Sequence, residues 1–135
     1  MDAMEENGRF ERGIVHFNAR EFFAAHEAWE ELWLRVPEPE KTFLQGIIQI
    51  AAGFHHYMRR NSRGARSLLA AGLAKLNRCP TAYRGVDMAR LRNDARKWSA
   101  RLTKPIENVR SDLPKIRLVR RPRKKPAKKK KRRMR

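Results

Sequence analysis

The stretch Phe17–Trp33, FNAREFFAAHEAWEELW, constrains the fold of this chain more than any other. Its apolar residues recur at spacings of three and four, which is the period of an amphipathic helix. Asn18 is followed three residues later by Glu21, the spacing of a capping box with Asn in place of Ser or Thr. We therefore predict that Asn18 is the N-cap of a helix that continues to about Arg35, before the loop sequence PEPE.

Helical spacing of apolar residues continues on both sides of this stretch. It predicts a first helix at about Glu5–Phe17, a helix at Lys41–Arg59, one after the Asn61–Gly64 turn, and one capped by Asp87. The helix at Lys41–Arg59 is apolar on most of its circumference, which is typical of a central helix packed on several sides. No segment alternates convincingly with period two, so we predict no sheet. The expected fold is all-α, a single bundle of about five helices with a central helix near 41–59.

The composition changes after the last predicted helix. Prolines at four positions from Pro105 onward break any long helix. From Lys115 onward the chain holds 14 Lys and Arg and no Asp or Glu, whereas the first 114 residues hold 19 basic and 14 acidic residues. Most of the formal net charge of +19 therefore belongs to the C-terminal segment. We predict a helical domain over 1–103 and a Lys/Arg-rich tail over 104–135 that is disordered.

A polycationic tail is expected to bind polyanions. When Lys and Arg neutralise phosphates they release counterions, so such binding falls steeply with salt. The tail has no aromatic residue, so base stacking and sequence readout are not expected, and we predict nonspecific association with nucleic acid. Two alternatives remain open: a solvated tail that only adds solubility, and attachment to an anionic membrane, for which no apolar anchor accompanies the charge. The residues predicted to contact nucleic acid are Arg120, Arg121, Arg123, Lys124, Lys125, Lys128, Lys129, Lys130, Lys131, Arg132, Arg133 and Arg135.

Three features of the sequence bear on where the protein resides. Cys79 is the single cysteine, so no intramolecular disulfide forms and a reducing compartment is the simplest setting. The N-terminus is acidic and lacks the apolar run of a secretory signal. The longest apolar run, Gly46–Phe54, is far shorter than the roughly 20 residues that a membrane helix needs. We expect a soluble, cytoplasmic protein without a transmembrane segment.

The most unusual polar residues lie within the predicted helices. On a helical wheel, His26 falls in the middle of the arc predicted to be buried, and Glu30 lies beside it one turn further on. Glu27 lies at the edge of that arc. The helix near 41–59 carries a polar stripe of its own, and the two stripes face each other if the two helices pack antiparallel. The predicted pocket residues are His26, Glu27, Glu30, Gln45, Gln49 and His56.

Burying these groups costs about 1–3 kcal/mol for each neutral group left unpaired, so they are expected to satisfy one another. One interpretation is a polar network that sets the helix register. A second is a small pocket for a ligand or a divalent metal ion, with His26, Glu30 and His56 as ligands; no cofactor is the default. A third is acid–base catalysis in which the His–Glu pair sets the protonation of the imidazole. The sequence HEAWE is similar to the zinc-protease motif HExxH, but Glu30 stands in place of the second His, so no complete catalytic motif is present.

Several motifs in order resemble one family. The sequence FNAREFFAAHEAWEELW is followed by LQGIIQIAAGFHH and then by RNSRGARSLL. This succession resembles the small helical proteins of the family catalogued as domain of unknown function 309, over about Phe10–Leu76. Arg60 departs from the family pattern, which has glycine before Asn61. The resemblance implies an all-helical fold and supplies no activity.

The function predicted from these features is a noncatalytic helical binding module for a small ligand or a protein partner. Its tail would hold the module near nucleic acid. The alternatives are a small metal- or ligand-binding protein or enzyme with a buried His/Glu/Gln pocket, and a scaffold whose polar network is purely structural. In the scaffold, the acidic surface of the first two helices would dock a basic partner.

Overall fold

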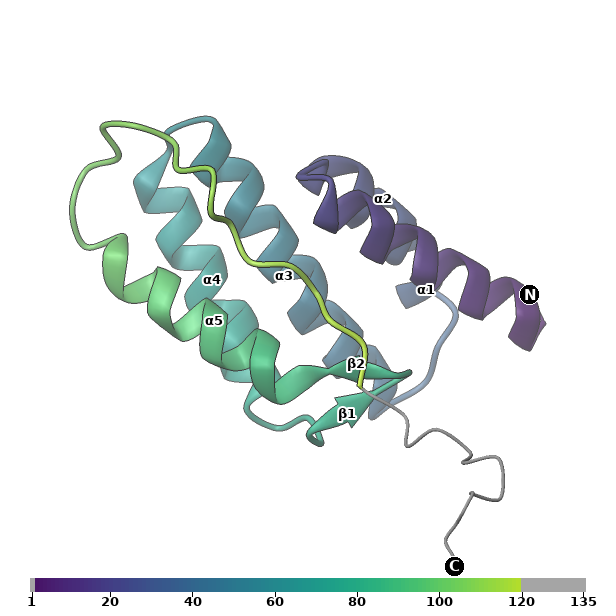
Figure 1. The fold of residues 1–135 in the computed structure, drawn as a ribbon. Helices are drawn as coiled ribbons and strands as arrows, with labels where there is room; N and C mark the ends of the chain where they lie inside the picture. The colour runs from purple at the N-terminus through teal and green to yellow at the C-terminus, as the bar shows by residue number, and fades with distance from the viewer. Residues whose placement is uncertain (1, 120–135) are drawn as a thin grey trace, which may run out of the picture.

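The computed structural model describes residues 2–119 and consists of five helices and one short hairpin (Figure 1). The helices are α1 (Ala3–Asn18), α2 (Phe22–Trp33), α3 (Glu40–Met58), α4 (Ser62–Leu76) and α5 (Met88–Arg101), and the strands are β1 (Ala82–Tyr83) and β2 (Val86–Asp87). The predicted all-α bundle is thus confirmed. Within the described range, no helix has the length and apolar character needed to cross a membrane. The predicted tail residues from 120 to 135 lie outside the described residues.

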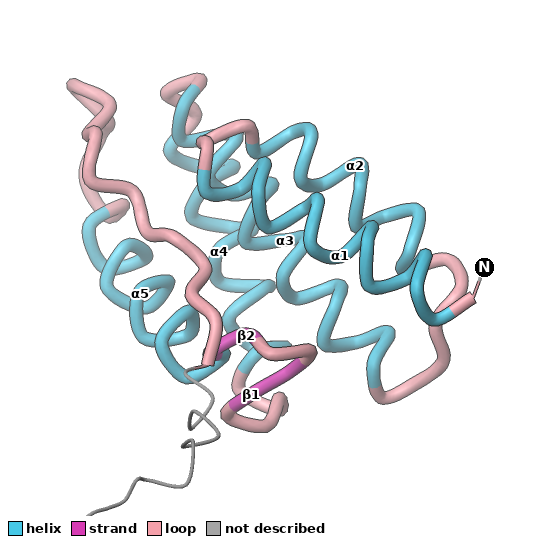
Figure 2. The backbone as a smooth tube through the Cα atoms, turned by 45° about the vertical axis from the view of Figure 1, so that its right-hand side comes forward, coloured by secondary structure: helices cyan, strands magenta, loops and turns pink. Residues whose placement is uncertain are grey.

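Helix α3 lies at the centre of the bundle, with α4 on one side and α1 and α2 on the other (Figures 1 and 2). Its apolar residues are buried on more than one face, as the sequence predicted. The helices α3 and α4 approach closely because glycines face each other: a Cβ on Gly72 would lie 2.8 Å from the backbone oxygen of Gly46. The glycine of the motif LQG therefore serves close helix packing.

The prediction that Asn18 caps the second helix is wrong. Asn18 is the last residue of α1, and α2 begins at Phe22, after an N-cap residue whose side chain makes no capping bond. The Asn18 amide instead binds the backbone of Ile116: its Nδ2 donates to the Ile116 oxygen at 3.0 Å, and its Oδ1 accepts from the Ile116 nitrogen at 2.7 Å. The side chain that the local spacing predicted to cap a helix thus forms its hydrogen bonds with a distant backbone segment.

The predicted helix start at Asp87 is confirmed, whereas the helix expected after the Asn61–Gly64 turn begins inside that turn, at Ser62. Asn61 caps α4, where its Oδ1 accepts from the Gly64 nitrogen at 3.0 Å. Asp87 caps α5 and accepts from the Arg90 nitrogen at 2.9 Å. Arg60, which replaces the family glycine, has a φ of 60°. The turn keeps the left-handed conformation that favours glycine, although the residue carries a side chain.

The hairpin between α4 and α5 was not predicted, because each strand has only two residues and shows no alternation to detect. The strands β1 and β2 pair antiparallel, with Tyr83 opposite Val86. The two turn residues, Arg84 and Gly85, have φ values of 48° and 80°, the left-handed region that a tight two-residue hairpin turn requires. Val86 forms a further antiparallel bridge with Leu118.

Residues 102–119 leave α5 and run back across the bundle to the hairpin (Figure 1). Leu113 and Ile116 are buried in the core. The Tyr57 hydroxyl accepts a hydrogen bond from the Arg110 nitrogen at 2.8 Å. Packing therefore continues past residue 103, where the sequence predicted the helical domain to end.

Candidate functional site

Glu30 is exposed and His26 is only half-buried, so the prediction that both are buried is wrong. Their side chains are 26% and 55% exposed, and Nε2 of His26 lies 3.5 Å from Oε2 of Glu30. Glu27 is exposed as well. The residues of α2 that reach the core are Phe22, Ala25, Trp29 and Leu32. The buried face of this helix is therefore not centred on His26. Trp33, at the end of α2, is only half-buried.

Within the predicted polar stripe of α3, Gln49 bonds to α4 and His56 lies beside Asn61, the N-cap of α4. Oε1 of Gln49 accepts from Nζ of Lys75 at 2.9 Å. Nδ1 of His56 lies 3.2 Å from Nδ2 of Asn61. Gln45 is half-buried. The two predicted stripes therefore do not join into one interhelical pocket. In residues 2–119 there is no group of three or more His, Cys, Asp or Glu side chains that could hold a metal ion, so the set predicted from His26, Glu30 and His56 is not assembled in this structure.

His56 instead supports the corner between α3 and α4. Asn61 uses its Oδ1 to accept from the Gly64 nitrogen, so its Nδ2 is the atom that donates to Nδ1 of His56. This assigns the ring proton of neutral His56 to Nε2. A Cβ at Gly64 would lie 3.0 Å from the same Nδ1. The motif residues His56, Asn61 and Gly64 thus form one packed helix corner.

A second histidine, His55, joins His26 at the surface through Phe23. Phe23 is 53% exposed. Its ring stacks on His26, with centroids 5.9 Å apart and an interplanar angle of 19°, and lies 5.5 Å from the His55 ring. Nδ1 of His26 is buried and has no hydrogen-bond partner in the described residues. We call Phe23, His26, Glu30 and His55 the histidine face; the spacing of His55 in the sequence indicates only an ordinary, partly exposed histidine.

Stability is expected to fall as the pH drops below about 6.5, in part through His55. Burial, followed by the nearby charges of His56, Arg59 and His26, lowers the pKa of His55 from its usual 6.5. The folded state thus binds the proton less tightly than the unfolded chain. The contribution is fully present above the unfolded pKa and is lost as pH falls through the folded one. His55→Gln should flatten this part of the curve, as measured by urea unfolding at several pH values; a curve parallel to that of the wild type would contradict it.

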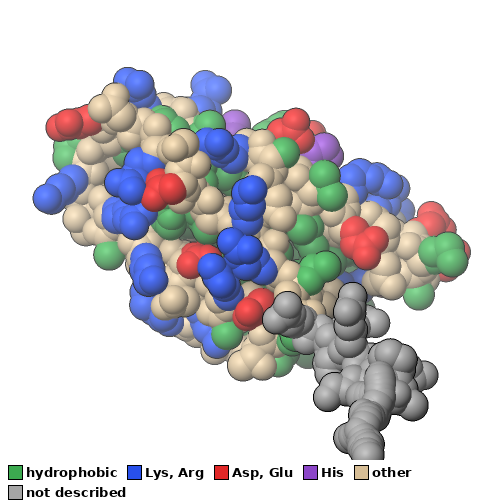
Figure 3. All heavy atoms as spheres, in the orientation of Figure 1, with side chains coloured by type: hydrophobic (Ala, Val, Ile, Leu, Met, Phe, Trp, Pro, Cys, Tyr) green, Lys and Arg blue, Asp and Glu red, His purple; other side chains and the backbone are tan. Residues whose placement is uncertain are grey.

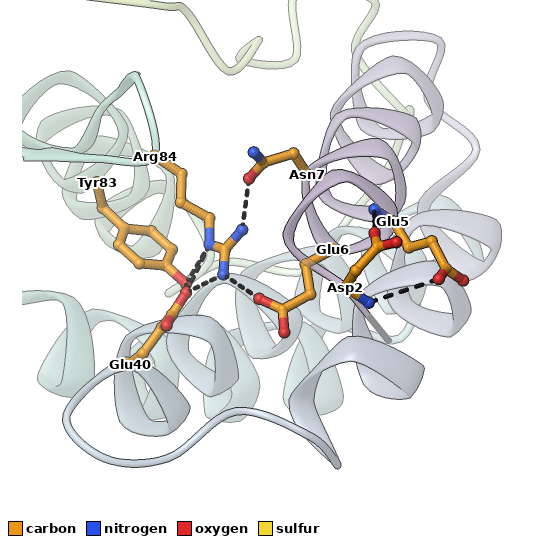
Figure 4. Close-up of polar contacts among 7 residues, drawn as sticks. All are labelled: Asp2, Glu5, Glu6, Asn7, Glu40, Tyr83 and Arg84. Atoms are coloured by element: carbon orange, nitrogen blue, oxygen red, sulfur yellow. Dashed lines mark hydrogen bonds and ion pairs between the residues drawn. The ribbon is translucent and has the colours of Figure 1, made fainter.

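A cluster that the sequence analysis missed centres on Arg84 (Figure 4). Arg84 donates through Nη1 to Oδ1 of Asn7 at 2.7 Å and through Nη2 to Oε1 of Glu6 at 3.0 Å. Its Nε donates to Oε2 of Glu40, which also accepts from the Tyr83 hydroxyl at 2.6 Å. Burial, followed by this bond to a carboxylate, raises the pKa of Tyr83, so the hydroxyl keeps its proton and donates it.

The Arg84 cluster joins α1, the first turn of α3 and the hairpin, and borders an open pocket of about 520 Å³. Every nitrogen of the guanidinium has an acceptor, so the cluster acts as a clamp between three elements. Arg84 lies 78 residues from Glu6 and 44 from Glu40 in sequence, and no local spacing brings them together.

A groove of about 480 Å³ lies between α5 and the extended segment 111–117. We call it the basic groove, because five Lys or Arg residues line it against two acidic ones. Figure 3 shows Lys and Arg side chains gathered on this face of the molecule, over α5 and the extended segment. The basic lining residues are Arg90, Lys97, Arg101, Lys115 and Arg117, and the acidic ones are Asp94 and Asp112.

Comparison with known proteins supports the resemblance found in the sequence. The chain is 39% identical over 59 residues to the uncharacterized protein YpuF of Bacillus subtilis (strain 168). This match covers 42% of this chain and 34% of the relative. It is 29% identical over 77 residues to an uncharacterized protein of Aquifex aeolicus (strain VF5), or 56% of this chain and 23% of that one. The chain thus spans about a third or less of the length of these relatives. Residues 10–68, which hold most of α1, all of α2 and α3 and the start of α4, match the model of the family described as Domain of unknown function (DUF309).

Proposed function

We propose that this protein is a helical binding module that associates nonspecifically with nucleic acid through its Lys/Arg-rich C-terminal segment. The observation that carries the proposal is the segregation of charge along the chain. Of the 16 residues from Arg120 to Arg135, 12 are Lys or Arg and none is acidic. Residues 1–36, in contrast, hold eight acidic residues and four Arg.

Phosphate neutralisation accounts for both the affinity and the lack of sequence preference. Each phosphate contact adds about 0.9 to the slope of log affinity against log salt concentration for duplex DNA. A segment with 12 positive charges can make several such contacts at once. Without aromatic residues, it has no side chain on which bases can stack. The expected binding is therefore tight at low salt, weak at high salt and insensitive to sequence.

The block Lys128–Arg133 gives a test that keeps the chain at full length. Replacing these six residues by Gln is expected to weaken binding to duplex DNA by about tenfold or more near physiological salt and to make the salt dependence shallower. Fluorescence anisotropy at several salt concentrations measures both effects. The control variant, Arg12→Gln with Arg35→Gln, changes two exposed Arg residues of the acidic region and should bind as the wild type does. Equal affinity and equal slope in the block variant would refute the proposal.

The metal-binding and acid–base alternatives gain no support from the described residues. Glu30 is more than half exposed, and His56 is engaged with Asn61 at the corner between α3 and α4. Burial raises the pKa of the Cys79 thiol to about 11, so this side chain is protonated and inert near neutral pH.

A further inference from the structure

We propose that the basic groove is a second, folded contact for the same nucleic acid and that it binds the sugar–phosphate backbone of a duplex. This inference rests on the proposed function, since the tail supplies the first contact. The groove adds to it a surface of defined shape, formed by α5 on one wall and by the extended segment 111–117 on the other.

The basic residues of the groove form two rows. On α5, Arg90, Lys97 and Arg101 follow one another at spacings of seven and four, which places them on one face of the helix. With a rise of 1.5 Å per residue, this row is about 16 Å long, which corresponds to about five base pairs of duplex. On the opposite wall, Lys115 and Arg117 are two residues apart in an extended segment, so their side chains project to the same side.

Three of the five cations have no acidic partner in residues 2–119. Asp94 lies 4.0 Å from Arg90, and Asp112 pairs with Arg110 at 2.8 Å and lies 4.0 Å from Arg101. The side chains of Lys97, Lys115 and Arg117 are exposed, and no acidic side chain of the described chain lies within ion-pair distance of them. These three cations are therefore available to phosphates.

The groove suits a backbone and not unstacked bases. Trp98 is its aromatic lining residue, but this residue is only 4% exposed. The Arg101 guanidinium lies over the ring, 4.8 Å from its centroid. Single-strand binding usually relies on open aromatic faces, and Trp98 offers none. This surface can therefore contact the phosphates along a duplex.

The groove also lies close to Val119, the residue before the Lys/Arg-rich stretch 120–135. A further hollow of about 740 Å³ continues from it along Arg90, Lys115, Arg117 and Val119. The Asn18 amide makes two hydrogen bonds to the backbone of Ile116, which holds the backbone between Lys115 and Arg117. Because residue 120 follows directly, a duplex held by the tail is kept at high local concentration at the groove.

The test uses the full chain with Lys97→Gln, Lys115→Gln and Arg117→Gln combined, and a matched control with Arg12, Arg35 and Arg59 changed to Gln. All six side chains are exposed, so the fold should persist, as thermal unfolding followed by circular dichroism checks. For a duplex of about 20 base pairs, we expect the groove variant to lose about tenfold in affinity at moderate salt and up to about 2.7 in the salt slope, three contacts at about 0.9 each. The single strand of the same sequence should lose less, and the control variant should bind as the wild type does.

The outcomes separate this inference from the proposed function. If the groove variant binds the duplex as the wild type does while the Lys128–Arg133 block variant loses binding, the tail acts alone and the groove inference is wrong. If neither variant differs from the wild type, both fail. Equal losses for duplex and single strand, or a loss confined to anionic vesicles of phosphatidylserine, would also overturn the assignment of the groove to a duplex.

Discussion

Gly13→Ala is expected to lower the free energy of unfolding by about 3 kcal/mol or more, the upper part of the range for overpacking a core. Gly13 is buried on the face of α1 that meets α2. A Cβ at this position would overlap the indole of Trp29 at Nε1. The same Nε1 donates a buried hydrogen bond to the backbone oxygen of Phe10 at 3.0 Å. Either Trp29 moves and this bond is lost, or the two helices separate.

Gly8→Ala is the matched control, because it places the same change in the same helix. A Cβ at Gly8 would meet no atom within 4 Å, so only helix propensity changes. The substitution should stabilise the protein by about 0.5–1 kcal/mol. Urea unfolding of both variants measures the two effects, which have opposite signs. If Gly13→Ala were neutral or stabilising as well, the close approach of Trp29 to α1 would be disproved.

Arg84→Asn is expected to lower the free energy of unfolding by about 2–3 kcal/mol, because it leaves partly buried carboxylates without a cation. The Arg84 side chain is 16% exposed, and those of its partners Glu6 and Glu40 are 26% and 28% exposed. Asn tolerates the left-handed backbone that Arg84 adopts at the hairpin turn, so the variant removes the side-chain contacts without adding strain.

Arg35→Asn serves as the control for this substitution. Arg35 is exposed, and its replacement should change stability by less than about 0.5 kcal/mol. Thermal and urea unfolding compare the two variants with the wild type. If Arg84→Asn has the same free energy of unfolding as the wild type, the clamp makes no net contribution to stability. In that case the cost of desolvation and backbone strain offsets the hydrogen bonds of Arg84. The same result would leave the proposed nucleic-acid binding untouched.

Local signals predicted most of the fold. The spacing of apolar residues located all five helices, and Asp87 caps α5 as the sequence predicted. These features depend on neighbours within about one helical turn, so a linear pattern contains them. The family resemblance rests on the same local motifs, several of which serve packing, such as Gly46 against α4 and Gly64 beneath His56.

The candidate sites were less predictable, because they depend on which surfaces meet. A wheel ranks the faces of α2 by hydrophobicity, but contact with α1 and α3 decided that Trp29 is buried and that His26 and Glu30 reach solvent. The Asn18 amide could cap a helix or bond to a distant backbone segment, and the folded chain pairs it with Ile116, 98 residues away.

By itself, the sequence determined where helices form and where charge accumulates, since both are properties of short segments and of composition. The tertiary structure alone decided the partners of Arg84, the close approach of Gly13 to Trp29, and the pairing of α5 with segment 111–117 that creates the basic groove. The physical reason is the same in each case. These contacts join residues distant in the chain, and their energies appear only after the helices have packed.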